Sequence, residues 1–118
     1  MSEVKIIKRD EAKAVELHKG FHEIWLCDKD LPTDNGVMAI ATFKPGVSCG
    51  LHMLDSEEFF YVLRGKGTGV IGDKKVELEQ DLTMYAPANT PHNYTNIGDT
   101  QMEILYFMSA KNFTTTKL

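Results

Sequence analysis

The chain has 118 residues, which suits one compact domain, residues 1–118, that buries roughly two thirds of its unfolded surface. Its net charge is −4, and Lys and Arg are scattered among the acidic residues, which argues against nucleic acid or an anionic membrane as a partner. Its longest apolar runs are too short for a signal peptide or a membrane span. We therefore expect a cytoplasmic protein with a small-molecule partner, in which Cys27 and Cys49 are reduced thiols.

The predicted elements are almost all strands. Only residues 9–17 have a helical composition, and Gly20 limits that helix to a turn or two. Downstream, short segments rich in β-branched and aromatic residues alternate with turn residues. Strands are predicted at residues 21–27, 37–44, 58–63, 68–71, 76–78, 83–86, 93–95 and 102–108, and the tail at 112–118 adds an edge strand or frays. Eight or nine short strands indicate an all-β fold, a jelly roll or barrel.

Three residues of metal-ligand type, His52, Glu58 and His92, fall where strands of such a barrel begin or end. Two imidazoles and one carboxylate suit a divalent ion, namely Fe, Mn, Ni, Zn or Co, and leave coordination positions open for a substrate. The alternative is a pocket that keeps the fold without the ion and holds the carboxylate by hydrogen bonds. Glu57 has the opposite strand parity to Glu58 and is expected to face solvent, unless a register change makes it the ligand.

Side-chain alternation predicts what lies beside these candidates. Leu54 shares a strand face with His52, and Phe60 shares one with Glu58. The predicted pocket lining consists of Leu54, Phe60, Tyr85 and Tyr94. The three aromatic residues are equally compatible with ordinary core packing. His18 and His22 precede these segments and are interpreted as ordinary strand or surface histidines rather than as a further ligand.

Two motifs of this sequence resemble those of the cupin superfamily. The first, residues 46–65, has the family's spacing at Gly46, His52, Glu58 and Gly65, and the second, residues 81–96, has it at Pro87, His92 and Asn96. The resemblance runs from residue 37 to residue 108 and implies a double-stranded β-helix whose ligands face the barrel interior. It also implies a homodimer, formed through N-terminal strands.

The sequence departs from the family pattern at three positions. Leu54 stands where the first motif has its second histidine, so a typical shell of three histidines and one glutamate lacks one ligand. Asp81 and Asn89 replace two glycines, and both residue types tolerate turns and the left-handed backbone conformation.

The resemblance implies two functions of different class. One is a metal-dependent enzyme acting on a small polar metabolite, with dioxygenase, isomerase or lyase chemistry. The other is a non-catalytic module that binds or senses a sugar or another metabolite, which Leu54 favours because it puts an apolar wall in place of a ligand. Bound metal with turnover distinguishes the enzyme from the module.

Overall fold

The structure, a computed structural model, describes residues 4–118, so residues 1–3 of the predicted domain lie outside the described residues. One 3-10 helix and eleven strands lie within residues 4–118: η1 (Arg9–Glu11), β1 (Lys13–His18), β2 (Phe21–Cys27), β3 (Val37–Phe43), β4 (His52–Leu54), β5 (Glu58–Arg64), β6 (Gly67–Ile71), β7 (Lys74–Leu78), β8 (Thr83–Ala86), β9 (His92–Asn96), β10 (Met102–Met108) and β11 (Thr115–Lys117). No helix in this part of the chain has the length and apolar character needed to cross a membrane.

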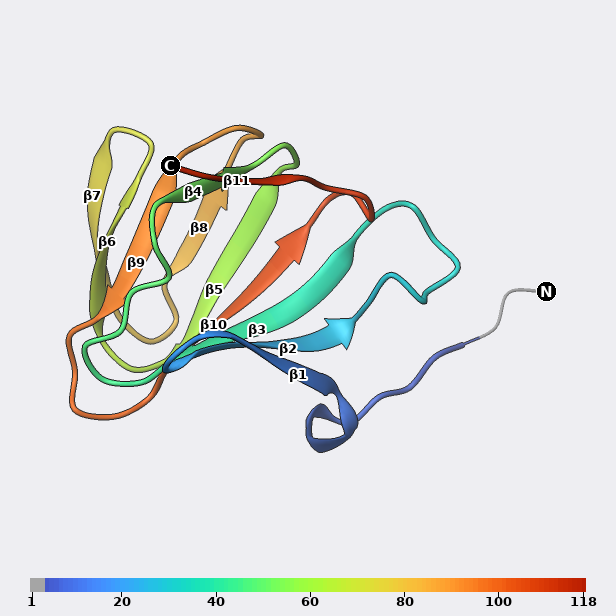
Figure 1. Cartoon of the computed structure of the whole chain (residues 1–118), viewed down its shortest axis with the longest axis horizontal. Coiled ribbons are helices and arrows are strands. Elements are labelled where there is room, and N and C mark those ends of the chain that lie inside the picture. Colours follow the sequence, from blue (N-terminus) through green and yellow to red (C-terminus); the bar gives the residue numbers. More distant parts are fainter. Residues whose placement is uncertain (1–3) are drawn as a thin grey trace.

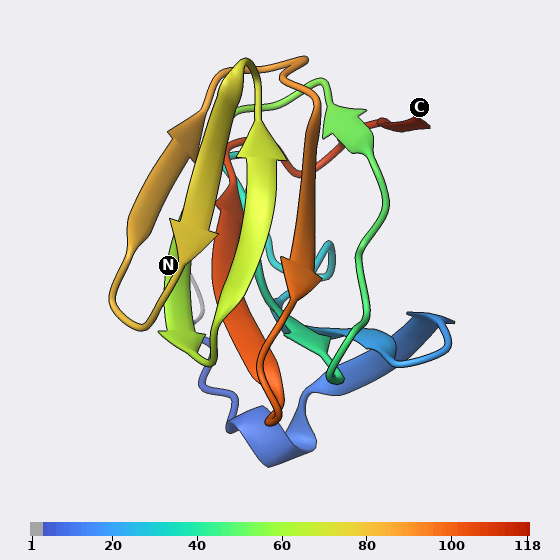
Figure 2. The ribbon, with the colours of Figure 1, turned by 90° about the vertical axis from the view of Figure 1, so that its left-hand side faces the viewer.

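The strands form two antiparallel sheets that face each other (Figures 1 and 2). One sheet has six strands in the order β1-β2-β3-β10-β5-β8, and the other has five in the order β11-β4-β9-β6-β7. The chain crosses from one sheet to the other after β3, β4, β5, β7, β8, β9 and β10, so several neighbours within a sheet are distant in the sequence. The predicted all-β, jelly-roll class is confirmed.

Of the turn or two of helix predicted within residues 9–17, the structure has one 3-10 turn, and the rest of the segment is mostly strand. Only η1 is helical there, and β1 forms a hairpin with β2 in which Val15 pairs with Glu23. Gly20 closes this hairpin with a φ of +85°, a conformation that glycine adopts without steric cost. The tail adds the edge strand β11, which pairs with β4. In β1, sheet pairing outweighs the weak local propensity for helix, and in the tail the structure shows the edge strand, one of the two expected alternatives.

Alternation along β5 shows how the sheets make a core. Glu58, Phe60 and Val62 are buried, whereas Phe59 and Tyr61 are exposed on the outer face. The inner face of β10 adds three further buried side chains, those of Met102, Ile104 and Met108. Full burial of an aliphatic side chain of this size contributes about 1.5–3 kcal/mol, so this layer is a main source of stability.

The two departures from the glycine pattern of the second motif adopt left-handed backbone. The φ angles are 71° at Asp81 and 63° at Asn89, as the tolerance of these residue types predicts. The Asn89 N–H donates to the carbonyl of Leu54 (2.6 Å), and the Asp81 N–H donates to that of Val62 (2.9 Å). Both turns therefore tie the second motif to the strand or loop that carries the first.

Candidate functional site

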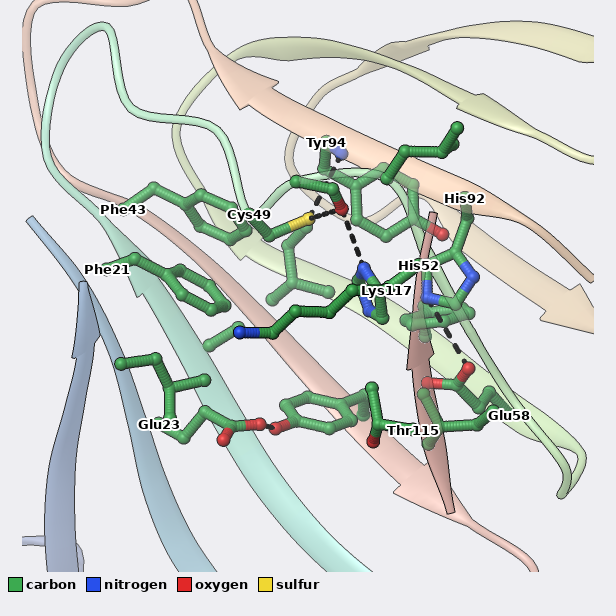
Figure 3. Close-up of a pocket in the computed structure, with 18 of the residues that line it drawn as sticks. Phe21, Glu23, Phe43, Cys49, His52, Glu58, His92, Tyr94, Thr115 and Lys117 are labelled. Carbon is green, nitrogen blue, oxygen red and sulfur yellow. Dashed lines mark hydrogen bonds and ion pairs between the residues drawn. The ribbon is translucent and has the colours of Figure 1, made fainter. Parts of the chain in front are cut away.

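A cavity of about 480 Å³ lies between the two sheets and opens beside β11 (Figure 3). Its wall is mostly apolar and aromatic, with side chains from both sheets, among them Phe21, Trp25, Phe43, Phe60 and Tyr94. A small number of polar side chains project into it from both sheets. This composition is typical of a site that binds an organic molecule and orients it with few polar contacts.

The strand ladder places His52 beside His92. β4 pairs with β9 at this one position, and the two ring centroids lie 4.3 Å apart. His92 is 1% exposed and His52 is half-buried. Forty residues of sequence separate them, so the contact depends on the packing of the whole five-stranded sheet.

Both imidazoles have the same tautomer, fixed by the backbone. Nδ1 of His52 lies 2.7 Å from the carbonyl oxygen of Gly50, and Nδ1 of His92 lies 2.9 Å from that of Thr90. A carbonyl only accepts, so each Nδ1 carries the proton and each Nε2 presents a lone pair. This is the arrangement in which histidine binds a metal, with a backbone carbonyl orienting the ring.

Glu58 meets this pair from the opposite sheet. It lies at the start of β5 and is 3% exposed, and its Oε1 is 3.4 Å from Nε2 of His92. Burial raises the pKa of Glu58 to about 8, and the charge of Glu23 adds to the rise. Burial lowers the pKa of His92 to about 4. The hydrogen bond to Thr90 raises this pKa, and the neighbouring His52 lowers it further. Both shifts favour the uncharged forms, so this end of the cavity contains a carboxyl group without a charged partner.

The three metal-ligand candidates therefore lie in one region of the cavity, but they are not gathered into a finished site. Among residues 4–118, no group of three or more His, Cys, Asp and Glu side chains is placed to hold a metal ion. The polar contact is between Glu58 and His92, while the imidazole of His52 packs on that of His92.

Leu54, Phe60 and Tyr94 line the cavity, but Tyr85 does not. Tyr85 is 51% exposed on the outer face of β8, where its ring packs on Phe59. Strand parity explains the correction, because the buried residues of β8 are the ones before and after it.

The remaining polar candidates have other positions. Glu57 is exposed and accepts a hydrogen bond from the hydroxyl group of Tyr85. Nε2 of His22 lies 2.9 Å from Oε2 of Glu16 on β1. His18 lies at the edge of the cavity and contacts the carbonyl of Ser48 (2.8 Å).

Neither cysteine forms a disulfide, and Cys49 lines the cavity. Burial raises the pKa of its thiol to about 11, so this thiol is protonated at neutral pH and is a poor nucleophile.

Sequence reasoning missed a second polar pair in the cavity. Glu23 lies on β2 between the two aromatic residues Phe21 and Trp25, on the same inward face. Its carboxylate accepts a hydrogen bond from the hydroxyl group of Tyr106 on β10. The available signal was that Glu23 alternates with Phe21 and Trp25 along the strand and so shares the strand face of two aromatic side chains. Lys117 on β11 also reaches over the cavity mouth (Figure 3), and no sequence signal marked it.

The chain resembles known proteins in sequence. It matches the family model of the cupin domain over residues 39–108. An uncharacterized protein of Methanocaldococcus jannaschii is 40% identical over 50 residues, which are 42% of this chain and 40% of that protein. Auxin-binding protein 4 of Zea mays is 31% identical over 80 residues, which are 59% of this chain and 39% of the maize protein. The match thus spans about two fifths of the length of each relative.

Solved structures extend the likeness to the whole fold. The polyketide cyclase RemF from Streptomyces resistomycificus has a TM-score of 0.85 at 20% identity, covering 98% of this chain and 86% of RemF. A variant of oxalate decarboxylase from Bacillus subtilis has a TM-score of 0.82 at 19% identity, covering 99% of this chain and 34% of that protein. At these identities the likeness shows the fold alone.

Proposed function

Because this chain belongs to the cupin family, we propose that it binds a small organic molecule in its cavity and holds a divalent metal ion with His52, Glu58 and His92. The observation that carries the proposal is that Nδ1 of both His52 and His92 contacts a backbone carbonyl, which leaves each Nε2 available to a metal ion, and that Nε2 of His92 contacts the buried Glu58 carboxyl group. The ion is Fe, Mn, Ni, Zn or Co, since imidazole and carboxylate together suit all five.

The donor set fits such an ion in chemistry and in the spacing of one pair. Two ligands that bind one ion at right angles and about 2.1 Å away lie about 3.0 Å from each other. The Nε2–Oε1 distance between His92 and Glu58 is 3.4 Å, close to that value. His52 is half-buried on a strand of three residues and is the ligand that must turn to complete the set. Binding a cation would also supply the positive charge that the Glu58 carboxylate lacks.

The neighbouring residues hold this end of the cavity in place. Phe60 packs edge-on against His92, with centroids 5.5 Å apart, and so fixes the plane of that imidazole. Leu54 is buried and adds an alkyl side chain to the lining of the same cavity. When bound, a divalent ion supplies a Lewis acid that polarises an oxygen of the organic molecule.

The cavity wall also supports a change in the expected ligand. A small polar metabolite would make few contacts with the aromatic side chains of Phe21, Phe43 and Trp25, whereas an aromatic or otherwise apolar body would pack against them. The maize relative named for auxin binding supports an organic ligand as well.

The second candidate function is a module that binds this ligand without turning it over. Leu54 favours it, because this alkyl side chain occupies the position where the family pattern has a further histidine. Metal content separates the two candidates at the first step, and turnover of a bound ligand separates them at the second.

We predict about one metal ion per chain in untagged protein purified without chelators, and loss of most of it in His52→Ala and His92→Ala. The measurement is metal analysis by mass spectrometry, repeated after reconstitution with each of the five ions. His22→Ala is the matched control, because the imidazole of His22 pairs with Glu16 and does not line the cavity. Wild-type protein that stays metal-free after reconstitution would contradict the metal site and leave the binding module.

The proposal includes a homodimer, formed through the outer face of β5, β8 and β10 in place of the N-terminal strands that the resemblance implies, while the cytoplasmic location stays a prediction. Phe59, Tyr85 and Phe107 form an outer aromatic face on the six-stranded sheet, with exposures of 44%, 51% and 38%. The ring centroids of Tyr85 and Phe107 lie 5.2 Å and 5.9 Å from that of Phe59, so the three rings make one continuous patch. Exposed patches of this kind mark association surfaces.

Phe59→Lys is therefore expected to convert a dimer into a monomer, because the substitution places a charge at the centre of the outer aromatic face. Light scattering coupled to size-exclusion chromatography measures the mass directly. Val70→Lys removes an exposed apolar residue from the other sheet and should leave the mass unchanged. A wild-type monomer, or a Phe59→Lys dimer, would refute this interface.

A further inference from the structure

The cavity contains a second polar pair, formed by the Glu23 carboxylate and the Tyr106 hydroxyl. The hydroxyl donates to Oε2 of Glu23. Figure 3 shows Glu23 on the opposite side of the cavity from His52, His92 and Glu58. The two polar ends therefore face each other across an apolar middle.

Two alanines on β3 make this pair possible. β3 lies between β2, which carries Glu23, and β10, which carries Tyr106. Ala41 pairs with Glu23, and Ala39 pairs with Tyr106. Both alanines are buried, and their short side chains leave space for the tyrosine to lie across β3 and reach the carboxylate. Any larger side chain at these positions would occupy that space.

The carboxylate of Glu23 has an oxygen without a donor. Among the described residues, none donates a hydrogen bond to Oε1 of Glu23, while Oε2 is occupied by Tyr106. Burial raises the pKa of Glu23 to about 7, which reflects the poor solvation of this group in an apolar wall. Glu23 is half-buried and lines the cavity, so Oε1 is open to the cavity, where a donor on a bound molecule can reach it.

The wall between the two polar ends is aromatic. Phe60 lies 5.4 Å from Tyr94 and 6.4 Å from Tyr106, measured between ring centroids. Ring faces and edges at these separations favour a flat aromatic guest. A cavity of about 480 Å³ accommodates a molecule of one or two rings.

We propose that Glu23 and Tyr106 select an aromatic ligand that carries a hydrogen-bond donor, a phenol hydroxyl or an aryl amine, at the end opposite His52 and His92. This inference rests on the proposed function, because it places the ligand in the same cavity. The donor binds Oε1 of Glu23, the Tyr106 hydroxyl orients the carboxylate, and an oxygen at the other end of the ligand lies at the metal end.

The pair is not explained by stability. A half-buried carboxylate in a mostly apolar wall has lost part of its hydration, and an apolar residue of similar size would pack there at lower cost. The Tyr106 hydroxyl satisfies one of the two oxygens only. A polar group that is incompletely satisfied within the fold and borders a cavity is placed to recognise a ligand.

The test uses two matched pairs of probes: 4-hydroxyphenylacetate with phenylacetate, and 4-aminobenzoate with benzoate. Saturation-transfer NMR detects binding, and titration calorimetry gives the affinities. Wild-type protein is expected to bind the donor-bearing member of each pair about tenfold more tightly, as a hydrogen bond to a charged group predicts. Equal affinities within both pairs, or no binding of any of the four probes, would overturn the inference.

Two variants locate the source of the preference. Glu23→Met keeps the length of the side chain and is expected to abolish it, and Tyr106→Phe, which removes a single oxygen, is expected to reduce it. Glu16→Met removes an exposed carboxylate from β1 and should leave the preference intact. A preference that survives in Glu23→Met, or that Tyr106→Phe leaves at its wild-type size, would also overturn the inference.

Metal analysis of the same samples keeps this result separate from the proposed metal site. A donor preference in metal-free wild-type protein would uphold the role of Glu23 and contradict the metal ion. Bound metal with no donor preference would uphold the metal ion and contradict the role of Glu23.

Discussion

Leu54→His is expected to tighten metal binding by roughly tenfold or more, because it adds a nitrogen donor beside an incomplete ligand set. Leu54 lies two residues after His52 on the same face of β4, is 5% exposed and lines the cavity. Without metal, the substitution replaces a buried alkyl group with a polar ring and should lower the free energy of unfolding by about 2–4 kcal/mol. Metal should recover that loss by binding the folded state alone.

Two measurements check this result. Competition against a chromophoric chelator gives the affinity for metal, and urea denaturation with and without metal gives the stability. Met53→His is the control, since Met53 lies on the opposite face of the same strand and does not line the cavity. If Leu54→His has the metal affinity of the wild type and metal does not stabilise it, the assignment of this end of the cavity to a metal ion is wrong.

Asn96→Ala is expected to lower the free energy of unfolding by about 3–5 kcal/mol. Asn96 is fully buried, and its amide group joins three backbone segments. Nδ2 donates to the carbonyls of Phe43 (2.9 Å) and Thr100 (2.8 Å), and Oδ1 accepts from the N–H of Gly98 (2.9 Å). Alanine would leave these backbone groups without that partner inside the protein.

Equilibrium unfolding in urea, with equal slopes for both proteins, measures this change. Asn112→Ala provides the matched control, since Asn112 is exposed in the tail and the change there should stay within about 0.5 kcal/mol. A loss of less than 1 kcal/mol at Asn96 would mean that water replaces the amide, and that this residue does not hold the end of β9 to its neighbours.

The strands and the glycine-like turns were predictable because local chemistry decides them. The bounds of β2, β8 and β10 agree with the predicted ones, since each has a dense run of β-branched, aromatic or other apolar residues between turn residues. The left-handed backbone at Asp81 and Asn89 follows from what those two residue types tolerate.

Long-range pairing decided the elements that could not be predicted. β1 is a strand because β2 offers it a partner, although its residues have no strong preference for either state. The same limit applies to β11, whose pairing with β4 is set by contacts more than sixty residues apart.

The site divides in the same way. His52, Glu58 and His92 were identifiable from their residue types and spacing, and they lie in one region of the cavity. Tyr85 was misplaced because the sequence alone does not fix which strand parity faces inward. Glu23 was overlooked because a lone carboxylate in a strand carries meaning only once its partner across β3 is known.

A cavity of about 480 Å³ between the sheets is also a gap in an otherwise close-packed interior, and this determines how the protein responds to heat. Any molecule that fills the gap binds the folded chain and not the unfolded one, so it raises the melting temperature by mass action. A ligand at a hundred times its dissociation constant adds about 2.7 kcal/mol, or roughly 10 °C for a chain of this size. Melting curves recorded against a metabolite collection can therefore rank natural ligands before any reaction is known.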